Sequence, residues 1–139
     1  MRPPVKKTIY HRDQSVEVLV KEDGFYGSYF EAKVVSHLDS IGLYVVKFDT
    51  LLEDQGTQFL NETVNPKDLR PQPPKISVKS FSVNQKVDAF DLDGWWYGVI
   101  SGNDGAHKYF VYFSYCDQEV SYPISQLRVH QEWIYGQWV

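Results

Sequence analysis

The chain contains one sequence pattern twice, and this internal repeat limits its possible folds more than any other feature. The first copy consists of Ser15–Val18, a glycine-aromatic segment at 24–32, an apolar segment at 44–48 and Leu69–Pro71. The second copy consists of Lys86–Ala89, 94–100, 109–113 and Leu127–Val129. Each copy needs only about 50 to 60 residues, close to the lower limit for independent stability. The repeat therefore predicts two small modules that pack together rather than one large domain.

The composition favours an all-β fold. Aromatic residues make up 16% of the chain, there are seven prolines, and no long segment shows apolar residues at helical spacing. Five short, strongly bent strands in each copy could close on themselves and so remove exposed sheet edges. We therefore expect two five-stranded barrels in tandem.

Proline residues indicate the module boundaries. Pro71, Pro73 and Pro74 lack backbone donors and hold their preceding residues extended, so this stretch cannot continue a sheet. The predicted organisation is an N-terminal tail at 1–13, a first module at 14–72, a linker at 73–82 and a second module at 83–139.

Charge and cysteine content restrict the partners. The single cysteine, Cys116, cannot form an internal disulfide, and no apolar segment resembles a signal peptide or a membrane span, which predicts a soluble intracellular monomer. The formal net charge of −4 opposes binding to nucleic-acid phosphates and suits a basic peptide.

Strand alternation predicts which aromatic side chains face the core. Phe30 shares a face with apolar neighbours, whereas Tyr29 shares the opposite face with charged ones. In the second copy Trp96 takes the core face together with Ile100, which leaves Trp95 as the exposed tryptophan. Phe48 and Phe113 end their strands and are expected at the mouths of the barrels.

Aromatic side chains beside acidic ones predict sites for an alkylammonium group, because ring faces attract a weakly hydrated cation. The candidates in the second module are Phe90, Trp95, Phe113 and Tyr115, with the acidic residues Asp88, Asp91, Asp117 and Glu119 nearby. The candidates in the first module are Phe25, Tyr29, Phe48 and Asp49. Acidic residues expected to hold the remainder of a basic peptide are Glu22, Asp23, Glu53, Asp54, Asp88 and Asp117.

Signals for catalysis are weak. A catalytic pair would require Cys116 as the nucleophile and His107 or His130 as the base. A cysteine that follows an aromatic strand end is usually a structural residue. The histidines lack zinc-ligand spacing, and the glycines lie between bulky aromatics rather than in a phosphate-binding loop. We expect no enzyme activity, no metal site and no cofactor.

The motifs resemble those of a known family. Gly24–Ala32 resembles the opening motif of the Agenet module, a plant Tudor-like domain, and Val87–Phe90 with Asp93–Trp96 resembles its second tandem copy. Leu127–Trp133, followed by Gly136–Trp138, resembles the closing motif of such pairs.

This resemblance implies two Tudor-like barrels in a nuclear, heterochromatin-associated reader of methylated lysine on the histone H3 tail, most of all a dimethylated lysine nine residues from the start. By position, the motif's tryptophan corresponds to Tyr29 and Trp95, and the rim aromatic corresponds to Phe48 and Phe113. Two alternatives remain open: a Tudor-like module that binds RNA or DNA, and a scaffold that docks proteins without requiring methylation.

Overall fold

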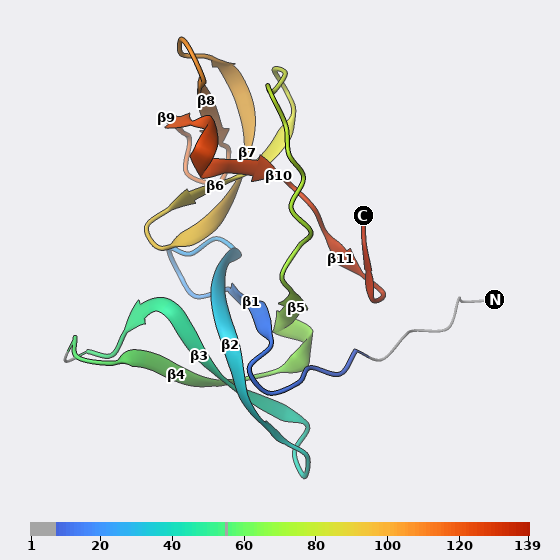
Figure 1. The fold of residues 1–139 in the computed structure, drawn as a ribbon. Coiled ribbons are helices and arrows are strands. Elements are labelled where there is room, and N and C mark those ends of the chain that lie inside the picture. The colour runs from blue at the N-terminus through green and yellow to red at the C-terminus, as the bar shows by residue number, and fades with distance from the viewer. Residues whose placement is uncertain (1–7, 55) are drawn as a thin grey trace. The chain divides into compact units, whose positions relative to one another are not determined.

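The computed structural model describes residues 8–54 and 56–139 and consists of two successive sets of five strands (Figure 1). The first set is β1 (Ser15–Val20), β2 (Ser28–Leu38), β3 (Leu43–Leu52), β4 (Phe59–Val64) and β5 (Leu69–Pro71). The second set is β6 (Lys86–Asp91), β7 (Gly94–Asn103), β8 (Lys108–Phe113), β9 (Gln118–Pro123) and β10 (Leu127–Val129). A short hairpin, β11 (Trp133–Ile134) and β12 (Gln137–Trp138), follows. The described residues contain no α-helix, which confirms the predicted all-β class.

The two sets have the same strand order. The first is ordered β4-β3-β2-β1-β5 and the second β9-β8-β7-β6-β10. In each set a 3-10 turn precedes the last strand: η1 (Pro66–Asp68) before β5 and η2 (Ile124–Gln126) before β10. The register shift between Val34 and Ser36 in β2 recurs between Ile100 and Gly102 in β7. The sequence repeat is therefore a structural repeat.

The prediction of closed barrels is wrong, because each set stays open along one side. The last strands have only three residues each, and β5 pairs with β1 while β10 pairs with β6. Among the described residues, β4 pairs only with β3 and β9 only with β8. The result is a Tudor-like, strongly bent sheet with two free edges rather than a complete barrel.

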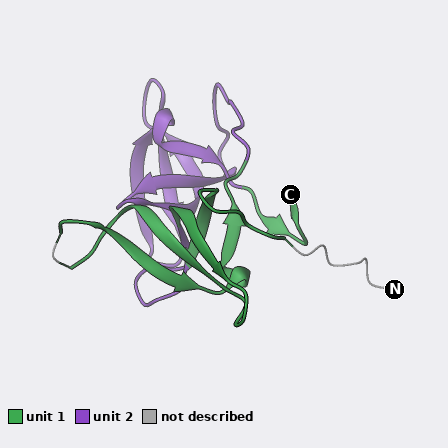
Figure 2. Cartoon of the chain, turned by 60° about the horizontal axis from the view of Figure 1, so that its bottom comes forward, with its two compact units in different colours: residues 1–19, 30–73, 131–139 green, residues 20–29, 74–130 purple. Residues whose placement is uncertain are grey.

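The chain divides into two compact units that do not follow the chain order (Figure 2). Among the described residues, unit 1 contains residues 8–19, 30–54, 56–73 and 131–139, and unit 2 contains residues 20–29 and 74–130. Residues 20–29, which the sequence places in the first module, thus pack in unit 2. Residues 131–139, expected to close the second module, pack in unit 1. The module boundaries themselves remain a prediction.

Inward-facing side chains form a separate core in each unit, as the alternation predicts. Phe30, Ala32 and Val34 are buried in unit 1, and Ile100 is buried in unit 2, where Trp96 packs against the core. The buried hydrophobic side chains of unit 1 are Tyr10, Val16, Val18, Phe30, Ala32, Val34, Tyr44, Val46, Phe48 and Leu69. Those of unit 2 are Phe81, Val87, Ala89, Ile100, Tyr109, Val111, Phe113, Tyr122 and Leu127.

The repeat begins further upstream than the sequence motifs indicate. Tyr10, in the predicted tail, is buried and packs edge-on against Tyr44 with 5.5 Å between ring centroids. Phe81, in the predicted linker, is likewise buried and packs edge-on against Tyr109 at 5.5 Å. In both units the tyrosine hydroxyl accepts a hydrogen bond from the backbone N–H of the upstream aromatic residue, at 3.2 Å. Each unit therefore uses an aromatic residue ahead of its first strand to complete its core.

An ion pair also recurs between the first and last strand of each set, buried in unit 1 and partly buried in unit 2. The Arg70 guanidinium donates to Glu17 Oε1 at 2.7 and 3.1 Å, and both side chains are almost fully buried. In unit 2 the Nε of Arg128 donates to Asp88 Oδ2 at 2.9 Å. Arg70 also lies 5.1 Å from the ring centroid of Trp138, so in unit 1 the pair extends to the final hairpin.

Candidate functional site

Unit 2 contains a pocket of about 260 Å³ whose wall is largely aromatic. The lining residues are Gly24, Tyr26, Asp91, Leu92, Trp96, Phe113, Tyr115, Cys116, Gln118, Val120 and Tyr122. They come from the segment between β1 and β2, the turn between β6 and β7, β7 itself, the end of β8 and the following turn, and β9. All of these segments belong to unit 2.

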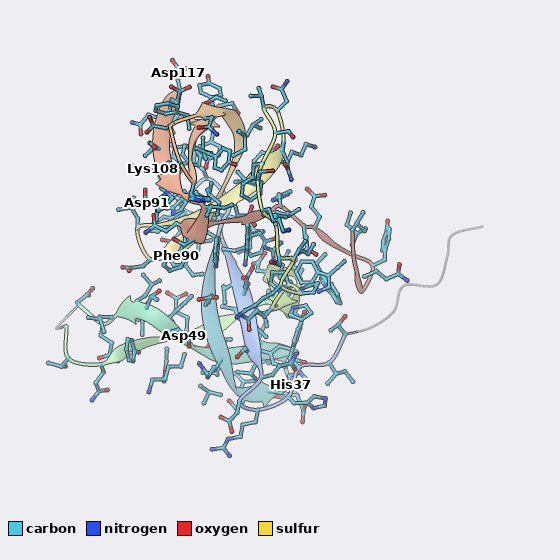
Figure 3. All side chains as sticks on the ribbon, turned by 45° about the horizontal axis from the view of Figure 1, so that its top comes forward. His37, Asp49, Phe90, Asp91, Lys108 and Asp117 are labelled. Atoms are coloured by element: carbon cyan, nitrogen blue, oxygen red, sulfur yellow. The ribbon has the colours of Figure 1, made fainter. Side chains whose placement is uncertain are left out.

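Asp91 is the carboxylate among these lining residues, and a tight turn holds it in place. It ends β6, and the next two residues, Leu92 and Asp93, have φ angles of 48° and 66°. Positive φ at both central positions is typical of a two-residue turn whose twist matches that of the flanking strands. The Asp91 carboxylate accepts hydrogen bonds from the Leu92 N–H at 2.8 Å and from the Tyr122 hydroxyl at 2.7 Å. Figure 3 labels Asp91 at this turn, beside Phe90.

Trp96 forms one side of the pocket, and its orientation is set by the same turn. The indole Nε1–H donates to the backbone oxygen of Asp91 at 2.6 Å. The ring of Phe25 stacks on Trp96, with a centroid distance of 6.4 Å and an angle of 13° between the planes. The tryptophan ring is thus held at one edge by a hydrogen bond and covered by a second aromatic ring.

Tyr26 is a wall of the pocket that comes from the segment preceding β2. Its φ of 52° lies in the left-handed region, and Gly24 and Gly27 on either side also have positive φ. The Tyr26 ring stacks on Tyr115, with 4.8 Å between centroids and 21° between planes. The Tyr115 hydroxyl in turn donates to the backbone oxygen of Tyr97 at 2.8 Å. Because Tyr26 is 53% exposed, it stands at the boundary between the pocket and solvent.

Two tyrosines of the pocket wall, Tyr115 and Tyr122, stay uncharged at physiological pH because their pKa values are raised. Burial raises the pKa of the Tyr115 hydroxyl above its ordinary value. Burial also raises the pKa of Tyr122, and its hydrogen bond to Asp91 adds to the effect. Neutral rings keep the electron-rich faces that attract cations, and an adjacent carboxylate adds a full negative charge. The pocket is suited to a positively charged, weakly hydrated head group.

Two of the four candidates in the second module line this pocket. Phe113 and Tyr115 do so, whereas Phe90 and Trp95 do not. Trp95 contacts Phe90, with 5.0 Å between ring centroids, and the Arg128 guanidinium lies 4.0 Å from the centroid of its ring. The tryptophan in the pocket is therefore Trp96. Its side chain points to the core face of β7, and near the start of this strand that face lines the pocket.

The four candidates in the first module are divided between the two units, with Phe25 and Tyr29 in unit 2 and Phe48 and Asp49 in unit 1. Phe25 packs on Trp96 in unit 2, and Tyr29 pairs with Trp95 through the start of β2. Phe48 is only 2% exposed, so it is a core residue rather than part of a rim. Asp49 accepts a hydrogen bond from Lys33 Nζ at 3.0 Å.

The repeat allows the same positions to be compared in unit 1. Val18 pairs with Leu69 as Ala89 pairs with Leu127, so Val20 is the counterpart of Asp91. Tyr44 pairs with Val64 as Tyr109 pairs with Tyr122. The counterparts of Asp91, Trp96, Tyr115 and Tyr122 in unit 1 are Val20, Phe30, Thr50 and Val64. These positions lack the carboxylate and the phenols of unit 2, so the pocket chemistry is not repeated.

The acidic candidates divide into three groups. Glu22 and Asp23 are exposed beside Gly24 of the pocket, and Asp117 is exposed beside Gln118, with an oxygen that accepts a hydrogen bond from Tyr112 at 2.8 Å. Glu53 and Asp54 are exposed in unit 1 between β3 and β4. Asp88 is 4% exposed, and its carboxylate is held by Arg128 and by His130 Nδ1 at 2.7 Å. Asp88 is thus an internal structural group rather than a surface for a peptide.

Three aromatic pocket residues were not selected from the sequence. Alternation predicts Trp96 in the core and does not by itself point to Tyr122 as a site residue, and Tyr26 lies in the segment 20–29 that packs in unit 2. The alternation of Val120 with Tyr122 along β9 is a signal that places both on one face of the strand. No comparable sequence signal identifies Tyr26, because its position depends on a loop rather than on a strand.

Neither a metal site nor a membrane-spanning helix is found in the described part of the chain. Residues 8–54 and 56–139 contain no group of three or more histidine, cysteine or acidic residues arranged to hold a metal ion. The same residues contain no helix long and apolar enough to cross a membrane.

Comparisons with known proteins agree with this architecture. The family model of the Agenet domain matches residues 13–74. The Arabidopsis thaliana protein AGENET DOMAIN (AGD)-CONTAINING P1 is 37% identical over 125 residues, which are 89% of this chain and 24% of the relative. The Arabidopsis thaliana DUF724 domain-containing protein 3 is 32% identical over 133 residues, which are 92% of this chain and 19% of the relative. The chain thus spans about a quarter or less of the length of these relatives.

Solved structures extend the similarity over both modules. The crystal structure of Arabidopsis thaliana AGDP1 AGD34 has a TM-score of 0.87 and 32% identity, covering 94% of this chain and 88% of that one. The structure of the ADCP1 tandem Agenet domain 3-4 has a TM-score of 0.82 and 30% identity, covering 94% and 86%. With the duplicated five-stranded fold and these two matches over almost its whole length, the chain belongs to the Agenet domain family, as a tandem pair of Agenet modules.

Proposed function

We propose that this tandem Agenet chain is a non-enzymatic chromatin reader whose unit 2 pocket binds a methylated lysine on the histone H3 tail. The preferred ligand is the dimethylated lysine nine residues from the start of the tail, a mark of heterochromatin, which implies action in the nucleus. The observation that carries the proposal is the Asp91 carboxylate set among the rings of Tyr26, Trp96 and Tyr122 in one pocket. The proposed site lies in the second copy of the repeat, completed by Tyr26 from the segment between β1 and β2.

The pocket composition matches a methylated ammonium group physically. Methylation keeps the charge of lysine but removes hydrogen-bond donors and weakens hydration, so ring faces become favourable partners. Each ring contributes roughly 0.5 to 2 kcal/mol, and several rings with a few peptide hydrogen bonds support about micromolar affinity. A dimethylammonium retains one N–H that can donate to Asp91, whereas a trimethylammonium has none. The carboxylate therefore favours the dimethyl form.

Acidic side chains near the pocket support a basic peptide as partner. Glu22, Asp23 and Asp117 are exposed next to pocket residues and would attract the lysines and arginines of a histone tail. The net charge of −4 is consistent with this preference and unfavourable for nucleic acid. We expect a monomeric chain that binds one peptide, without a cofactor.

Calorimetry with H3 tail peptides that differ only in methylation of the ninth lysine tests the proposal. We expect the dimethylated peptide to bind at least tenfold more tightly than the unmodified one, a difference of about 1.4 kcal/mol. Equal binding of all peptides would exclude a methyl-lysine reader and favour a scaffold that docks proteins without requiring methylation. Nucleic-acid binding that falls steeply with salt would favour the RNA or DNA alternative.

A matched pair of variants tests the location of the site. Tyr26→Ala removes a ring that lines the pocket, and because Tyr26 is 53% exposed the fold should tolerate the change. Tyr135→Ala removes a 67% exposed tyrosine that does not line the pocket and has a similar positive φ of 51°. We expect only the Tyr26 variant to lose affinity for the dimethylated peptide. Equal affinities of the two folded variants would show that the methyl-lysine binds elsewhere.

A further inference from the structure

We propose that the peptide main chain binds along the free edge of β9 as an added strand, which delivers the alkylated lysine into the pocket. This inference rests on the proposed function and adds the way in which the partner's backbone is recognised. Side chains in the pocket then select the lysine, whereas strand pairing supplies affinity that does not depend on sequence.

The first observation is that β9 is an edge strand. Within the described residues it pairs on one side with β8, from Lys108↔Pro123 to Phe113↔Gln118, and with no other strand. An edge strand presents a row of backbone N–H and C=O groups to any extended chain that lies beside it. Proteins usually protect such edges with lysine, proline or a bulge. In β9 the register to β8 has no shift, and the proline, Pro123, stands only at the last position.

The second observation is that the pocket opens along this strand. Gln118, Val120 and Tyr122 alternate along β9, and all three line the pocket. A chain paired with β9 would lie about 4.8 Å away and direct every second side chain to the same face of the sheet. A lysine at one of these positions enters the pocket, where the Tyr122 hydroxyl contacts Asp91.

The third observation is the charge along β9. Asp117 precedes the strand and Glu119 lies within it, and both are exposed, whereas no lysine or arginine lies between 117 and 123. Glu119 accepts a hydrogen bond from the Ser101 hydroxyl at 2.7 Å, so its carboxylate is held on the sheet surface. These charges suit an extended peptide rich in lysine and arginine and oppose an acidic one. The occupant is therefore a basic, extended segment rather than a second copy of this acidic chain.

Backbone N-methylation of the peptide tests strand pairing. The probe is the H3 tail peptide dimethylated on its ninth lysine, prepared with single N-methyl groups on successive backbone amides around that lysine. In a strand, the N–H groups of successive residues point to opposite edges, so those of every second residue face the same edge. We expect every second N-methyl group to weaken binding roughly three- to tenfold and the intervening ones to have little effect. Equal effects at all positions, or no effect at any, would overturn the proposal.

Hydrogen exchange of the protein provides an independent measurement. Binding of the same peptide should slow the exchange of alternate amides within Gln118–Tyr122 of β9. The edge strand β4 of unit 1, Phe59–Val64, serves as the internal control, because its residues line no part of the pocket. Unchanged exchange in β9, with tight binding of the dimethylated peptide, would refute strand pairing and leave the proposed reader function intact. If the unaltered chain bound the dimethylated and the unmodified peptide equally well, that result would refute the proposed function instead.

Discussion

Substitution of Gly98 in β7 should affect both the stability of the unit 2 core and ligand binding in the unit 2 pocket. A Cβ atom at Gly98 would lie 2.5 Å from Val111 Cγ1 and 3.0 Å from Cδ1 and Cε1 of Phe113. Carbon atoms in contact normally lie about 3.5 to 4.0 Å apart, so the neighbours would have to move by roughly 1 Å. Val111 is in the core and Phe113 lines the pocket. The variant Gly98→Ala should therefore disturb both.

The size of the effect follows from the cost of overpacking. Inserting a methyl group into a filled core costs roughly 1 to 3 kcal/mol, which lowers the folding equilibrium constant about 5- to 150-fold. The counterpart of Gly98 in unit 1 is Ala32, which is fully buried beside Phe48, so the same fold accepts a methyl group where the neighbours leave room. Displacement of Phe113 should also weaken binding of the dimethylated peptide.

Urea unfolding and calorimetry measure the two effects, with Gly102→Ala in the same strand as the matched control. A Cβ at Gly102 would meet only Phe110 Cδ2, at an ordinary 3.7 Å. The control should therefore unfold within about 0.5 kcal/mol of the parent chain. If Gly98→Ala unfolds at the same urea concentration as the control and binds the peptide equally well, the packing argument is wrong.

Three further predictions concern charge and protonation. Asp91→Asn should reduce the affinity for the dimethylated peptide more than for the trimethylated peptide, because only the dimethylammonium has an N–H to donate. Calorimetry with both peptides measures the ratio of the two affinities, and the same ratio in the variant and the parent chain would refute the prediction. Glu17→Gln should destabilise the chain by about 3 kcal/mol in urea unfolding, because it removes the negative charge that faces the buried Arg70 guanidinium at 2.7 Å, and an unchanged midpoint would contradict it. Burial raises the pKa of Tyr10 to about 12, whereas an unfolded tyrosine has a pKa of about 10. The stability that its neutral hydroxyl contributes is therefore complete below about pH 10 and is lost as the pH rises through about 12. The free energy of unfolding of Tyr10→Phe should therefore fall less between about pH 10 and 12 than that of the parent chain. Equal falls in the two proteins would contradict the prediction.

The fold class and the composition of the cores could be predicted from the sequence because both depend on local rules. Alternation along a strand assigns each side chain to a face, and this was sufficient to place Phe30, Ala32 and Val34 in the core of unit 1. The repeat together with the expected barrel predicted five strands in each copy. Sequence could not predict that the sheets stay open, because closure depends on whether the three-residue strands β5 and β10 reach a second neighbour.

The positions of Tyr10 and Phe81 show the same limit at the module ends. Neither lies in a strand, so alternation makes no statement about them; the low apolar periodicity of residues 1–13 predicts a tail, and the proline cluster at 71–74 predicts a linker. Their burial results from contacts with Tyr44 and Tyr109, 34 and 28 residues further along the chain. The ion pair of Glu17 with Arg70 is likewise a contact between residues distant in sequence.

The sequence by itself determined that the chain is an all-β duplication of the Agenet type, with inward-facing aromatics in each copy and an acidic surface. Only the tertiary structure decided which aromatics form the pocket: Trp96 rather than Trp95, joined by Tyr26 from the segment before β2. The physical reason is that alternation specifies the face of a strand but not how far along the sheet the core ends, and not which loop covers the opening. An inward-facing ring packs in the core where other side chains cover it, and it becomes a pocket wall where the sheet is open.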